Sequence, residues 1–428
     1  MDKEKFIEAY YTTRKNKRRS ADSVEFELHW ERNIVRLMNG LEDHTFTPSA
    51  YTFIATRPRP REVFACEMAL RVVHHYIDMR IRPLLESEMT DRTFNNRVGY
   101  GAIEAVNCVI SDICDVSQGF TKDAWIIKMD LKGYFPNASQ EIVFRQLSDL
   151  VERRYEGEDK DLLQFMIMRS VFSYPTRHCY RKSALEKWKD IPDAKSLFKK
   201  PEGIGGAIGH LIWQNAMNYY LNDIDHWIIG TPIRNISSSL CGASESERFV
   251  DGLGLHYVRF VDDMLIVTDN KECTLVQIQE IRRRLAALGC ELHDKKFYCQ
   301  HYTKGVDFIG THIKIDRVYV NDRVVRNMRE AIHQFNSCVS VKKLGSFLSS
   351  INSYLGILKG RNAYAIMCNL LKEVSPKWAK YCHFNKERRC FQANEGYRHT
   401  QLIAKKYNLK YKNHDNKRKN LSTGVKTA

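Results

Sequence analysis

The sequence lacks the features that mark membrane-spanning and secreted proteins. Its longest stretch without a formally charged residue, 203–222, contains His210, Gln214 and three asparagines, and is too polar to cross a bilayer. The first eleven residues, MDKEKFIEAYY, include no apolar core of the kind found in signal peptides. The twelve cysteines form no CxxC pair, so we interpret them as reduced thiols of the core. These absences predict a cytoplasmic protein with no membrane partner.

Glycine and proline are scarce, at 22 and 10 of 428 residues, while 43% of the residues are hydrophobic. These proportions exclude collagen-like, low-complexity and disordered classes and indicate a globular protein of two or three domains. Basic residues outnumber acidic residues, so the formal net charge is +16. Most of the excess positive charge lies in RKNKRR at 14–19 and in residues 405–428. We interpret both windows as basic arms that neutralise nucleic-acid phosphates, although a merely solubilising role is the alternative.

The middle of the chain shows alternating strand and helix patterns. The apolar run 124–130, AWIIKMD, predicts a strand that ends on Asp130. Asn137 or Ser139 is expected to cap the helix that follows. Apolar residues at helical spacing then cover 207–228, which predicts one long helix.

Two further strand patterns, LHYVRF and MLIV, flank the sequence VDD. This arrangement predicts a β-hairpin with Asp262 and Asp263 at its tip. A helix over 275–288 and a strand over 306–315 are expected next.

The order strand, helix, hairpin, helix, strand is that of a ferredoxin-type sheet, here interrupted by an insertion at about 153–206. Antiparallel pairing in such a sheet can bring Asp130 beside the hairpin tip. Beyond residue 325 the pattern is helical, with an apolar stripe between Leu344 and Leu358. We therefore predict a separate helical domain there.

Three carboxylates at adjacent strand ends make a hard oxygen site suited to Mg²⁺. Two such ions can clamp the attacking and leaving oxygens of a phosphoryl transfer. A DD pair alone is weak evidence, because turns favour Asp for local hydrogen bonding.

The surrounding motifs supply the context. YVRFVDDMLIV resembles the catalytic hairpin of reverse transcriptases, with Phe260 where that family usually has Tyr, and IIKMDLKGYF resembles their first metal-binding strand. PRPREVFACEMALRVVHHYI and FNNRVGYGAIEAV look like the finger motifs, DKKF like the segment with a triphosphate-facing Lys, and VDFIGTHI like the primer grip. The resemblance runs from about Pro58 to Leu371.

Within reverse transcriptases, the chain most resembles the enzymes of diversity-generating retroelements. Most reverse transcriptases have QGxxxSP where this chain has IGHLIWQ, whereas the diversity-generating enzymes have an aliphatic residue followed by GxxxSQ. Ile208, Gly209 and Gln214 follow the second pattern, and Trp213 stands where Ser is expected. The inserted segment CYRKSALEKWKDIPDAKSLF and the thumb sequence SYLGILKGRNAY are also similar to that subfamily.

The resemblance implies roles for individual residues. Asp130, Asp262 and Asp263 would be catalytic and bind metal, with the main-chain carbonyl of Leu131 as a further ligand. Phe135 would be the aromatic gate that excludes a ribose 2′-OH, unless it is an ordinary core residue. The nucleotide-binding residues implied are Arg61, Arg97, Phe135, Ile208, Gly209, Gln214 and Lys296, with Lys295 as a competitor for Lys296.

Two other groups of residues have no implied catalytic role. His74 and His75 lie in a helical pattern without carboxylate or cysteine spacing, so packing or RNA contact is favoured over a metal site. Gly203, Gly205 and Gly206 are not followed by GK[ST], so they do not form a P-loop.

We predict an α+β right-hand polymerase with fingers, a ferredoxin-like palm and an all-α thumb. The predicted domains are a basic N-terminal helical arm at 1–50, fingers and palm at 51–320, a helical thumb at 321–400 and a basic C-terminal tail at 401–428.

The predicted reaction is RNA-directed DNA synthesis with two Mg²⁺ ions, for which Mn²⁺ is an alternative. The partners implied are template RNA, a cDNA or primer, deoxynucleoside triphosphates and an accessory variability determinant protein, in a bacterium or phage. A retron or phage-defence reverse transcriptase, and a non-catalytic RNA-binding scaffold, remain alternatives. A nucleotide cyclase is disfavoured because RFVDDM does not supply its GG[DE]EF signature.

Overall fold

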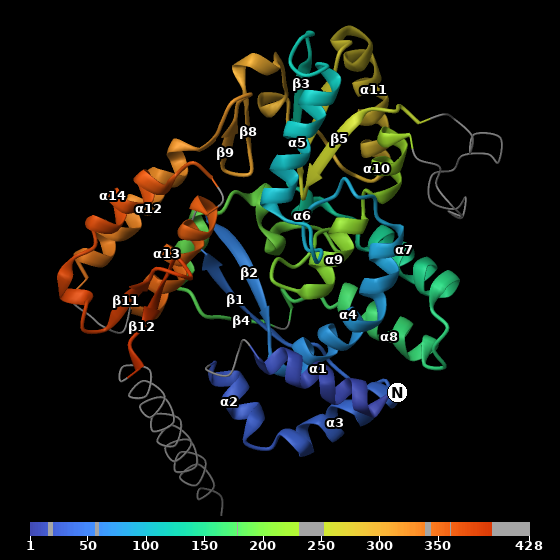
Figure 1. Ribbon diagram of the computed structural model, residues 1–428. Coiled ribbons are helices and arrows are strands. Elements are labelled where there is room, and N and C mark those ends of the chain that lie inside the picture. Colours follow the sequence, from blue (N-terminus) through green and yellow to red (C-terminus); the bar gives the residue numbers. More distant parts are fainter. Residues whose placement is uncertain are drawn as a thin grey trace, which may run out of the picture. The chain divides into compact units, whose positions relative to one another are not determined.

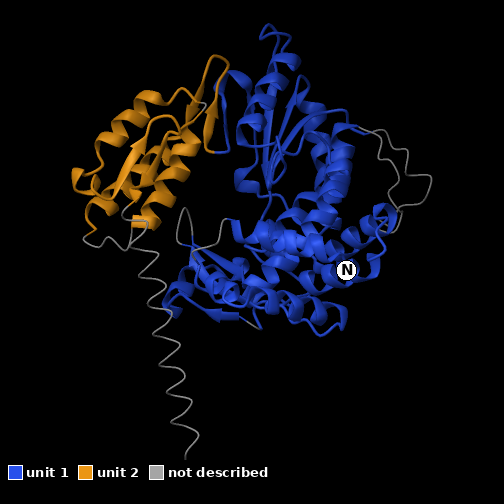
Figure 2. Cartoon of the chain, turned by 60° about the horizontal axis from the view of Figure 1, so that its bottom comes forward, with its two compact units in different colours: residues 1–309 blue, residues 310–428 orange. Residues whose placement is uncertain are grey.

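The computed structural model describes residues 1–15, 20–55, 60–177, 179–230, 252–338, 344–359 and 361–395 (Figure 1). The chain divides into two compact units, Met1–Ile309 and Gly310–Ala428, which have different colours in Figure 2. All of the predicted site residues lie in the first unit. In the described part of the chain, no helix combines the length and the apolar character needed to cross a membrane.

The first unit contains a four-stranded antiparallel sheet with the strand order β5-β6-β3-β7. Its strands are β3 (Trp125–Asp130), β5 (His256–Phe260), β6 (Asp263–Thr268) and β7 (Tyr298–His301). The spatial order second, third, first, fourth is that of a ferredoxin-type β-α-β-β-α-β sheet.

The fourth strand is not the one that the sequence predicted. Residues 298–301 pair with β3, whereas the predicted strand over 306–315 is interrupted. Ile309 and Gly310 have positive φ angles and separate β8 (Val306–Phe308) from β9 (Thr311–Ile313). Because β7 is half-buried throughout and has no apolar alternation, its sequence carries little strand signal.

The helix signals in the sequence around these strands correspond in part to observed helices. The helices that precede or follow the strands along the chain are α5 (Ala102–Val116), which contacts β5 and β6, α6 (Tyr134–Asn137), α7 (Gln140–Arg154) and α11 (Lys271–Ala287). Ser139 caps α7, because its side chain accepts a hydrogen bond from the Ile142 N–H at 3.3 Å. Gly289, at φ 69°, lies just beyond the end of α11, as expected of a helix stop.

The predicted single helix over 207–228 is two helices, α9 (Leu211–Tyr219) and α10 (Asn222–Ile229). The chain turns at Tyr220, whose carbonyl accepts a hydrogen bond from the Gln146 side chain and whose hydroxyl donates to the Leu288 carbonyl. Leu221 then leaves the helical conformation, at φ −103° and ψ 10°, a break that apolar spacing alone could not reveal.

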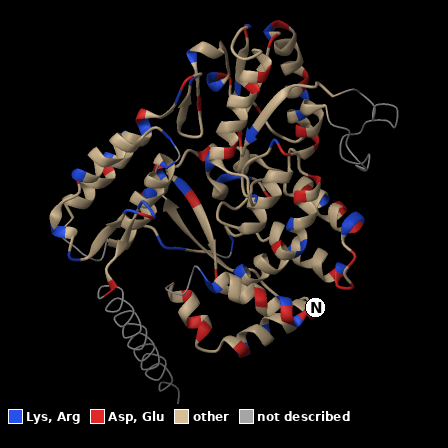
Figure 3. Cartoon of the chain, in the orientation of Figure 1, with Lys and Arg blue, Asp and Glu red and all other residues tan. Residues whose placement is uncertain are grey.

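Helices among the first 42 residues pack into the body of the first unit. These helices are α1 (Lys3–Lys15), α2 (Ala21–Glu27) and α3 (Trp30–Glu42). Phe6 and Tyr10 of α1 and Leu41 of α3 are buried in the same core as residues of α4 (Met68–Glu88). Residues 16–19 of the basic run and the predicted tail at 401–428 lie outside the described residues. In the described part, basic and acidic residues are intermixed on both units (Figure 3).

A second sheet is built from β1 (Ala50–Ala55), β2 (Arg61–Cys66) and β4 (Cys179–Arg181). The predicted insertion at 153–206 contributes β4 to this sheet and α8 (Lys160–Val171) to the core. It also contains three short 3₁₀ helices, at Leu185–Asp190, Asp193–Lys195 and Leu197–Lys199. The Ser196 hydroxyl and the Leu197 N–H donate to the buried Glu62 carboxylate of β2, so the insertion is tied to this sheet.

The second unit has a helical core formed by α12 (Asp322–Asn336), α13 (Leu344–Leu358) and α14 (Tyr364–Lys372). Its strands are β9, β10 (Val318–Val320), β11 (Cys382–Asn385) and β12 (Cys390–Ala393). The expectation of an all-α region over 321–400 is therefore wrong. The β11–β12 hairpin was missed because two four-residue strands give almost no periodic signal, and Phe384 and Phe391 pack on the helices instead of forming a helical stripe.

Candidate active site

The three predicted aspartates meet where β3 ends and the β5–β6 hairpin turns. Asp130, the last residue of β3, lies opposite Asp263, the first residue of β6. Asp262 precedes Asp263 in the turn, and its carbonyl accepts a hydrogen bond from the Leu131 N–H at 3.3 Å. The main chain of Leu131 thus faces the hairpin. The structure brings together three carboxylates and one main-chain segment that the sequence placed far apart.

The hairpin turn is tight and has a strained backbone at Val261, whose φ is +59°. β-Branched residues rarely adopt this left-handed conformation, so other groups must stabilise it. The Asn95 side chain accepts a hydrogen bond from the Val261 N–H at 2.9 Å, and Arg259 donates to the Val261 carbonyl at 3.2 Å. Both polar groups of the Val261 backbone are therefore held by side chains.

Arg259 is completely buried and forms an ion pair with the equally buried Asp225 of α10. Its Nε lies 2.9 Å from Asp225 Oδ1 and its Nη2 2.5 Å from Oδ2, a bidentate arrangement. The Tyr257 hydroxyl donates to Asp225 at 2.9 Å, and Arg259 also donates to the Asn218 carbonyl at 2.7 Å. This network connects the β5–β6 hairpin to α9 and α10.

The carboxylates repel one another at this site. Burial, followed by the charges of Asp263 and Asp130, raises the pKa of Asp262 to about 6. Burial also raises the pKa of Asp263, against the opposing effect of Lys128. A bound cation would remove the cost of keeping these groups ionised together.

Two lysines partly compensate the negative charge. Lys128 lies on β3, and its Nζ is 3.6 Å from Asp263 Oδ1. Lys296 comes from the short 3₁₀ helix Asp294–Lys296 and forms an ion pair with Asp130. Of the two lysines that the sequence offered for the triphosphate, Lys295 and Lys296, it is Lys296 that contacts a carboxylate of the site. Among the described residues, none forms an ion pair with Asp262.

The donor set at this site fits a divalent metal. It consists of carboxylate oxygens with an adjacent main-chain segment, which are hard ligands of the kind that Mg²⁺ prefers. Burial and the charges of Asp263 and Asp130 raise the pKa of Asp262, and a bound cation would counter both effects. The residues present are therefore compatible with a divalent metal ion.

Phe135 lies in α6, five residues after Asp130, and is half-buried. Its carbonyl accepts a hydrogen bond from the Gly206 N–H at 2.8 Å. The neighbouring Tyr134 is buried and donates to the Met217 carbonyl at 2.6 Å. These bonds fix the short helix against the segment that leads into α9, so the backbone around Phe135 is held in place while its ring stays partly exposed.

Ile208 and Gly209 run beside β2. The Phe64 N–H donates to the Ile208 carbonyl at 2.7 Å, and Gly209 adopts φ +108°. A Cβ at Gly209 would lie 2.6 Å from the Phe64 carbonyl oxygen, so the close approach of the two chains requires glycine.

Trp213, which stands where the subfamily pattern has Ser, is a buried core residue. A Cβ at position 206 would lie 2.4 Å from its indole ring, so Gly206 makes room for the tryptophan. The substitution of a large ring for a small polar residue is thus accommodated within the core.

The remaining predicted residues are not in contact with the aspartates. Arg97 donates from Nη1 to the carbonyls of Thr90 and Thr93 and lies over the Tyr100 ring, so its guanidinium stabilises its own loop. Arg61 is exposed at the start of β2, and Gln214 is half-buried in the first turn of α9.

Sequence reasoning missed the residues that support the hairpin: Asn95, Asn218, Asp225 and Arg259. A signal for two of them existed, since Arg259 interrupts an apolar strand and Asp225 lies among apolar residues of a helix. Charged residues in such positions are rarely buried unless they are paired. Their partners, however, come from distant segments and could not be identified by spacing.

Residues 55–313 match the family model described as reverse transcriptase (RNA-dependent DNA polymerase). No curated protein matches the sequence. Among solved structures, telomerase from Candida albicans in complex with a fragment of telomeric RNA is similar at 12% identity and a TM-score of 0.40, over 76% of this chain and 60% of that chain. Apo telomerase from Candida tropicalis is similar at 12% identity and a TM-score of 0.44, over 76% of this chain and 56% of that one.

The chain thus spans about three fifths of the length of these telomerases. The matched domain is that of RNA-directed DNA polymerases, which are nucleotidyltransferases with a right-hand fold, and the mixed α and β content of the first unit agrees with it. Because the family model covers more than half of its residues, the protein belongs to the reverse transcriptase family.

Proposed function

We propose that this protein copies a template RNA into cDNA by adding deoxynucleotides to a primer 3′-OH. The observation that supports this most strongly is the meeting of Asp130, Asp262 and Asp263 at two adjacent strand ends, within a domain of the reverse transcriptase family. A non-catalytic RNA-binding scaffold would have no need to keep three mutually repelling carboxylates together.

In this proposal, Asp130, Asp262 and Asp263 hold two Mg²⁺ ions, or Mn²⁺, with the Leu131 carbonyl as a further ligand. When bound, two such ions stabilise the attacking and leaving oxygens of an in-line displacement. The raised pKa of Asp262 means that this carboxylate must lose its proton before it can bind a cation.

Lys296 forms an ion pair with Asp130, and we propose that it binds the triphosphate of the incoming nucleotide. Its side chain is 45% exposed, so it can move from the carboxylate to an incoming triphosphate without breaking core packing. Arg61 and Arg97 are the other proposed triphosphate contacts, and Arg97 would have to release Thr90 and Thr93 to make one. The half-buried Phe135 ring would exclude a ribose 2′-OH by steric overlap.

Primer extension on an RNA template tests the proposed activity. The full-length chain, a DNA primer and the four deoxynucleoside triphosphates should give extended primer in Mg²⁺ and none in excess chelator. Tight RNA binding without extension in either Mg²⁺ or Mn²⁺ would instead establish a non-catalytic scaffold.

We further propose that the enzyme serves a diversity-generating retroelement of a bacterium or phage. In such a system it would copy a template-repeat RNA with an accessory variability determinant protein as partner, and it would make errors opposite template adenines. The support for this assignment is the IGHLIWQ segment, in which Ile208 replaces the Gln of most reverse transcriptases. An aliphatic side chain cannot form the polar contact with the incoming nucleotide that Gln makes.

Sequencing cDNA copied from a balanced RNA template tests this assignment. We expect frequent adenine-directed errors, reduced in Ile208→Gln and retained in the aliphatic control Ile208→Leu. If the missing polar contact contributes roughly 1–3 kcal/mol to the preference for the correct nucleotide, its loss lowers the discrimination against incorrect nucleotides about ten- to two-hundred-fold. Low, evenly distributed errors in the wild type would favour a retron or phage-defence enzyme and leave the polymerase proposal intact.

A further inference from the structure

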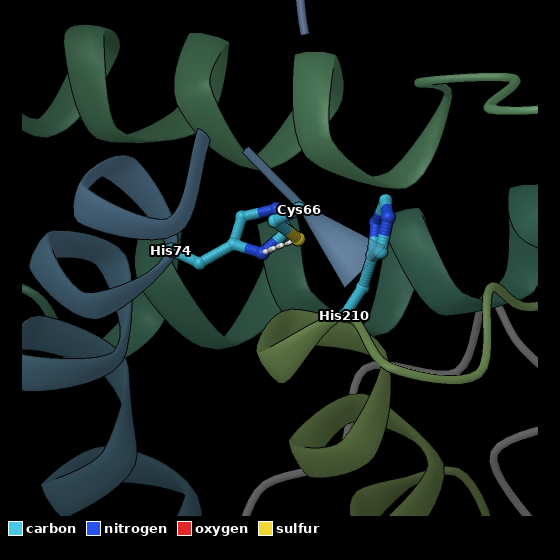
Figure 4. A group of neighbouring side chains, drawn as sticks. All are labelled: Cys66, His74 and His210. Atoms are coloured by element: carbon cyan, nitrogen blue, oxygen red, sulfur yellow. Dashed lines mark hydrogen bonds between the residues drawn. The ribbon is translucent and has the colours of Figure 1, made fainter. Parts of the chain in front are cut away.

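Three metal-ligating side chains from distant parts of the sequence meet inside the first unit. Cys66 is the last residue of β2, His74 lies in α4, and His210 is the residue immediately before α9 (Figure 4). Their sulfur and ring nitrogen atoms all lie within 4.8 Å of one another. Cys66 is 3% exposed and both histidines are fully buried.

The nitrogen atoms of this cluster have almost no partners. Neither ring nitrogen of His210 forms a hydrogen bond, and Nε2 of His74 forms none. The one hydrogen bond among the three side chains joins Cys66 Sγ and His74 Nδ1, at 3.5 Å, and the two imidazole rings lie 5.2 Å apart between centroids. Buried polar atoms without partners are costly and uncommon, so three of them beside a thiol indicate that a ligand belongs there.

Burial keeps all three side chains in their uncharged forms. Burial lowers the pKa of His74 well below its ordinary value and that of His210 to about 3, so both imidazoles are neutral with a free lone pair. Burial also raises the pKa of Cys66 to about 12, against a smaller opposing effect of Arg71. The proton of this thiol would therefore leave only when a strongly bound cation replaces it.

We propose that Cys66, His74 and His210 form a structural binding site for one Zn²⁺ ion. One thiolate and two imidazoles are ligands that zinc accepts, with bonds of about 2.3 Å to sulfur and about 2.0–2.1 Å to nitrogen. In a tetrahedron these bonds place sulfur and nitrogen about 3.5 Å apart, which is the separation of Cys66 Sγ and His74 Nδ1. The wider pairs need to close by at most about 1.5 Å, since two zinc-bound nitrogens of a tetrahedron lie about 3.3 Å apart.

The fourth position of the tetrahedron would go to a small oxygen ligand, either water or a main-chain carbonyl. No other cysteine, histidine or carboxylate of the described residues belongs to the cluster. The mixed sulfur and nitrogen donors disfavour Mg²⁺, which prefers oxygen, so this site is chemically separate from the aspartates.

A zinc ion at this position would fix the segment that contains Ile208 and Gly209. His210 directly follows this segment, and the Phe64 N–H already donates to the Ile208 carbonyl. The ion would add a second link between β2 and the start of α9, and a third to α4. This inference rests on the geometry of the cluster alone, so it stands or fails independently of the polymerase activity.

Metal analysis of the full-length protein tests the proposal without any activity assay. Protein purified from zinc-supplemented medium should contain about one zinc ion per chain. Protein produced with Co²⁺ instead should show the thiolate-to-cobalt charge-transfer absorption that a Cys ligand produces. A wild-type protein with neither zinc nor this absorption would overturn the proposal, whatever the variants do.

Two variants and a matched control locate the ion. Cys66→Ser and His210→Gln should each lose the zinc, while Cys290→Ser, which removes a different buried thiol, should retain it. If a variant fails to fold, the wild-type cobalt spectrum still decides whether a cysteine binds the metal. Full zinc content in a folded Cys66→Ser protein would contradict the assignment.

Discussion

Removal of the Asp225 carboxylate should both destabilise the protein and reduce primer extension. The carboxylate and the Arg259 guanidinium are both fully buried and form a bidentate pair. Asp225→Ala leaves the arginine charge buried without a counter-ion, a change that costs about 3–5 kcal/mol in comparable cases. For a folding unit of this size, this corresponds to a fall in melting temperature of roughly 6–10 °C.

Two further variants separate the buried charge from the rest of the network. Tyr257→Phe removes one hydrogen bond to Asp225 but leaves the ion pair, so it should cost only about 1–2 kcal/mol. The double variant Asp225→Leu with Arg259→Met removes both charges and should regain part of the lost stability. It should not regain primer extension, because the bond from Arg259 to the Val261 carbonyl is lost as well.

Urea unfolding and primer extension on the same preparations are the measurements. With the single variants Asp225→Leu and Arg259→Met measured as well, the coupling free energy between the two positions follows from the double-mutant cycle. If Asp225→Ala lowers the free energy of unfolding by less than about 1 kcal/mol, the variant does not leave an uncompensated Arg259 charge in the core, and this would refute the reasoning. Wild-type extension by the double variant would refute the positioning role of Arg259.

Two further predictions concern the site itself. Phe135→Ala should raise ribonucleotide incorporation relative to deoxynucleotide incorporation, because the ring that would overlap the 2′-OH is gone; unchanged discrimination in a single-nucleotide assay would make Phe135 an ordinary packing residue. The pKa of Asp262, raised to about 6, means that without metal the free energy of unfolding should fall as pH rises from about 4 to 6, since the folded state holds the extra proton in that range. Mg²⁺ needs the ionised carboxylate, so it should raise the melting temperature more at pH 7.5 than at pH 5; an equal increase at both values would contradict this assignment.

Local signals in the sequence predicted the elements that carry the aspartates. The apolar run that ends on Asp130 and the two strands around Asp262 are short-range patterns, and the structure has both β3 and the β5–β6 hairpin where they were expected. The cap of α7, Ser139, is one of the two residues that the sequence offered, because capping depends on neighbours three residues away.

Features that depend on distant partners were not predictable in the same way. β7 becomes a strand by pairing with β3, although its own sequence lacks alternation. At the break between α9 and α10, Tyr220 forms hydrogen bonds with Gln146 and Leu288, which lie far away in the sequence. Likewise, spacing argued against a metal role for His74, because neither Cys66 nor His210 stands at a recognisable interval from it.

If the clustered aspartates bind the metal ions that catalyse nucleotide addition, Asp262→Asn should abolish that activity. Asn keeps the shape of the side chain but loses the charge that a divalent cation needs. In Mg²⁺, this variant should extend a primer on RNA at least about a hundredfold more slowly than the wild type, with RNA affinity nearly unchanged. Asp269→Asn makes the same chemical change at an exposed position beyond the end of β6 and should retain wild-type extension. Wild-type extension by a folded Asp262→Asn protein would contradict the account.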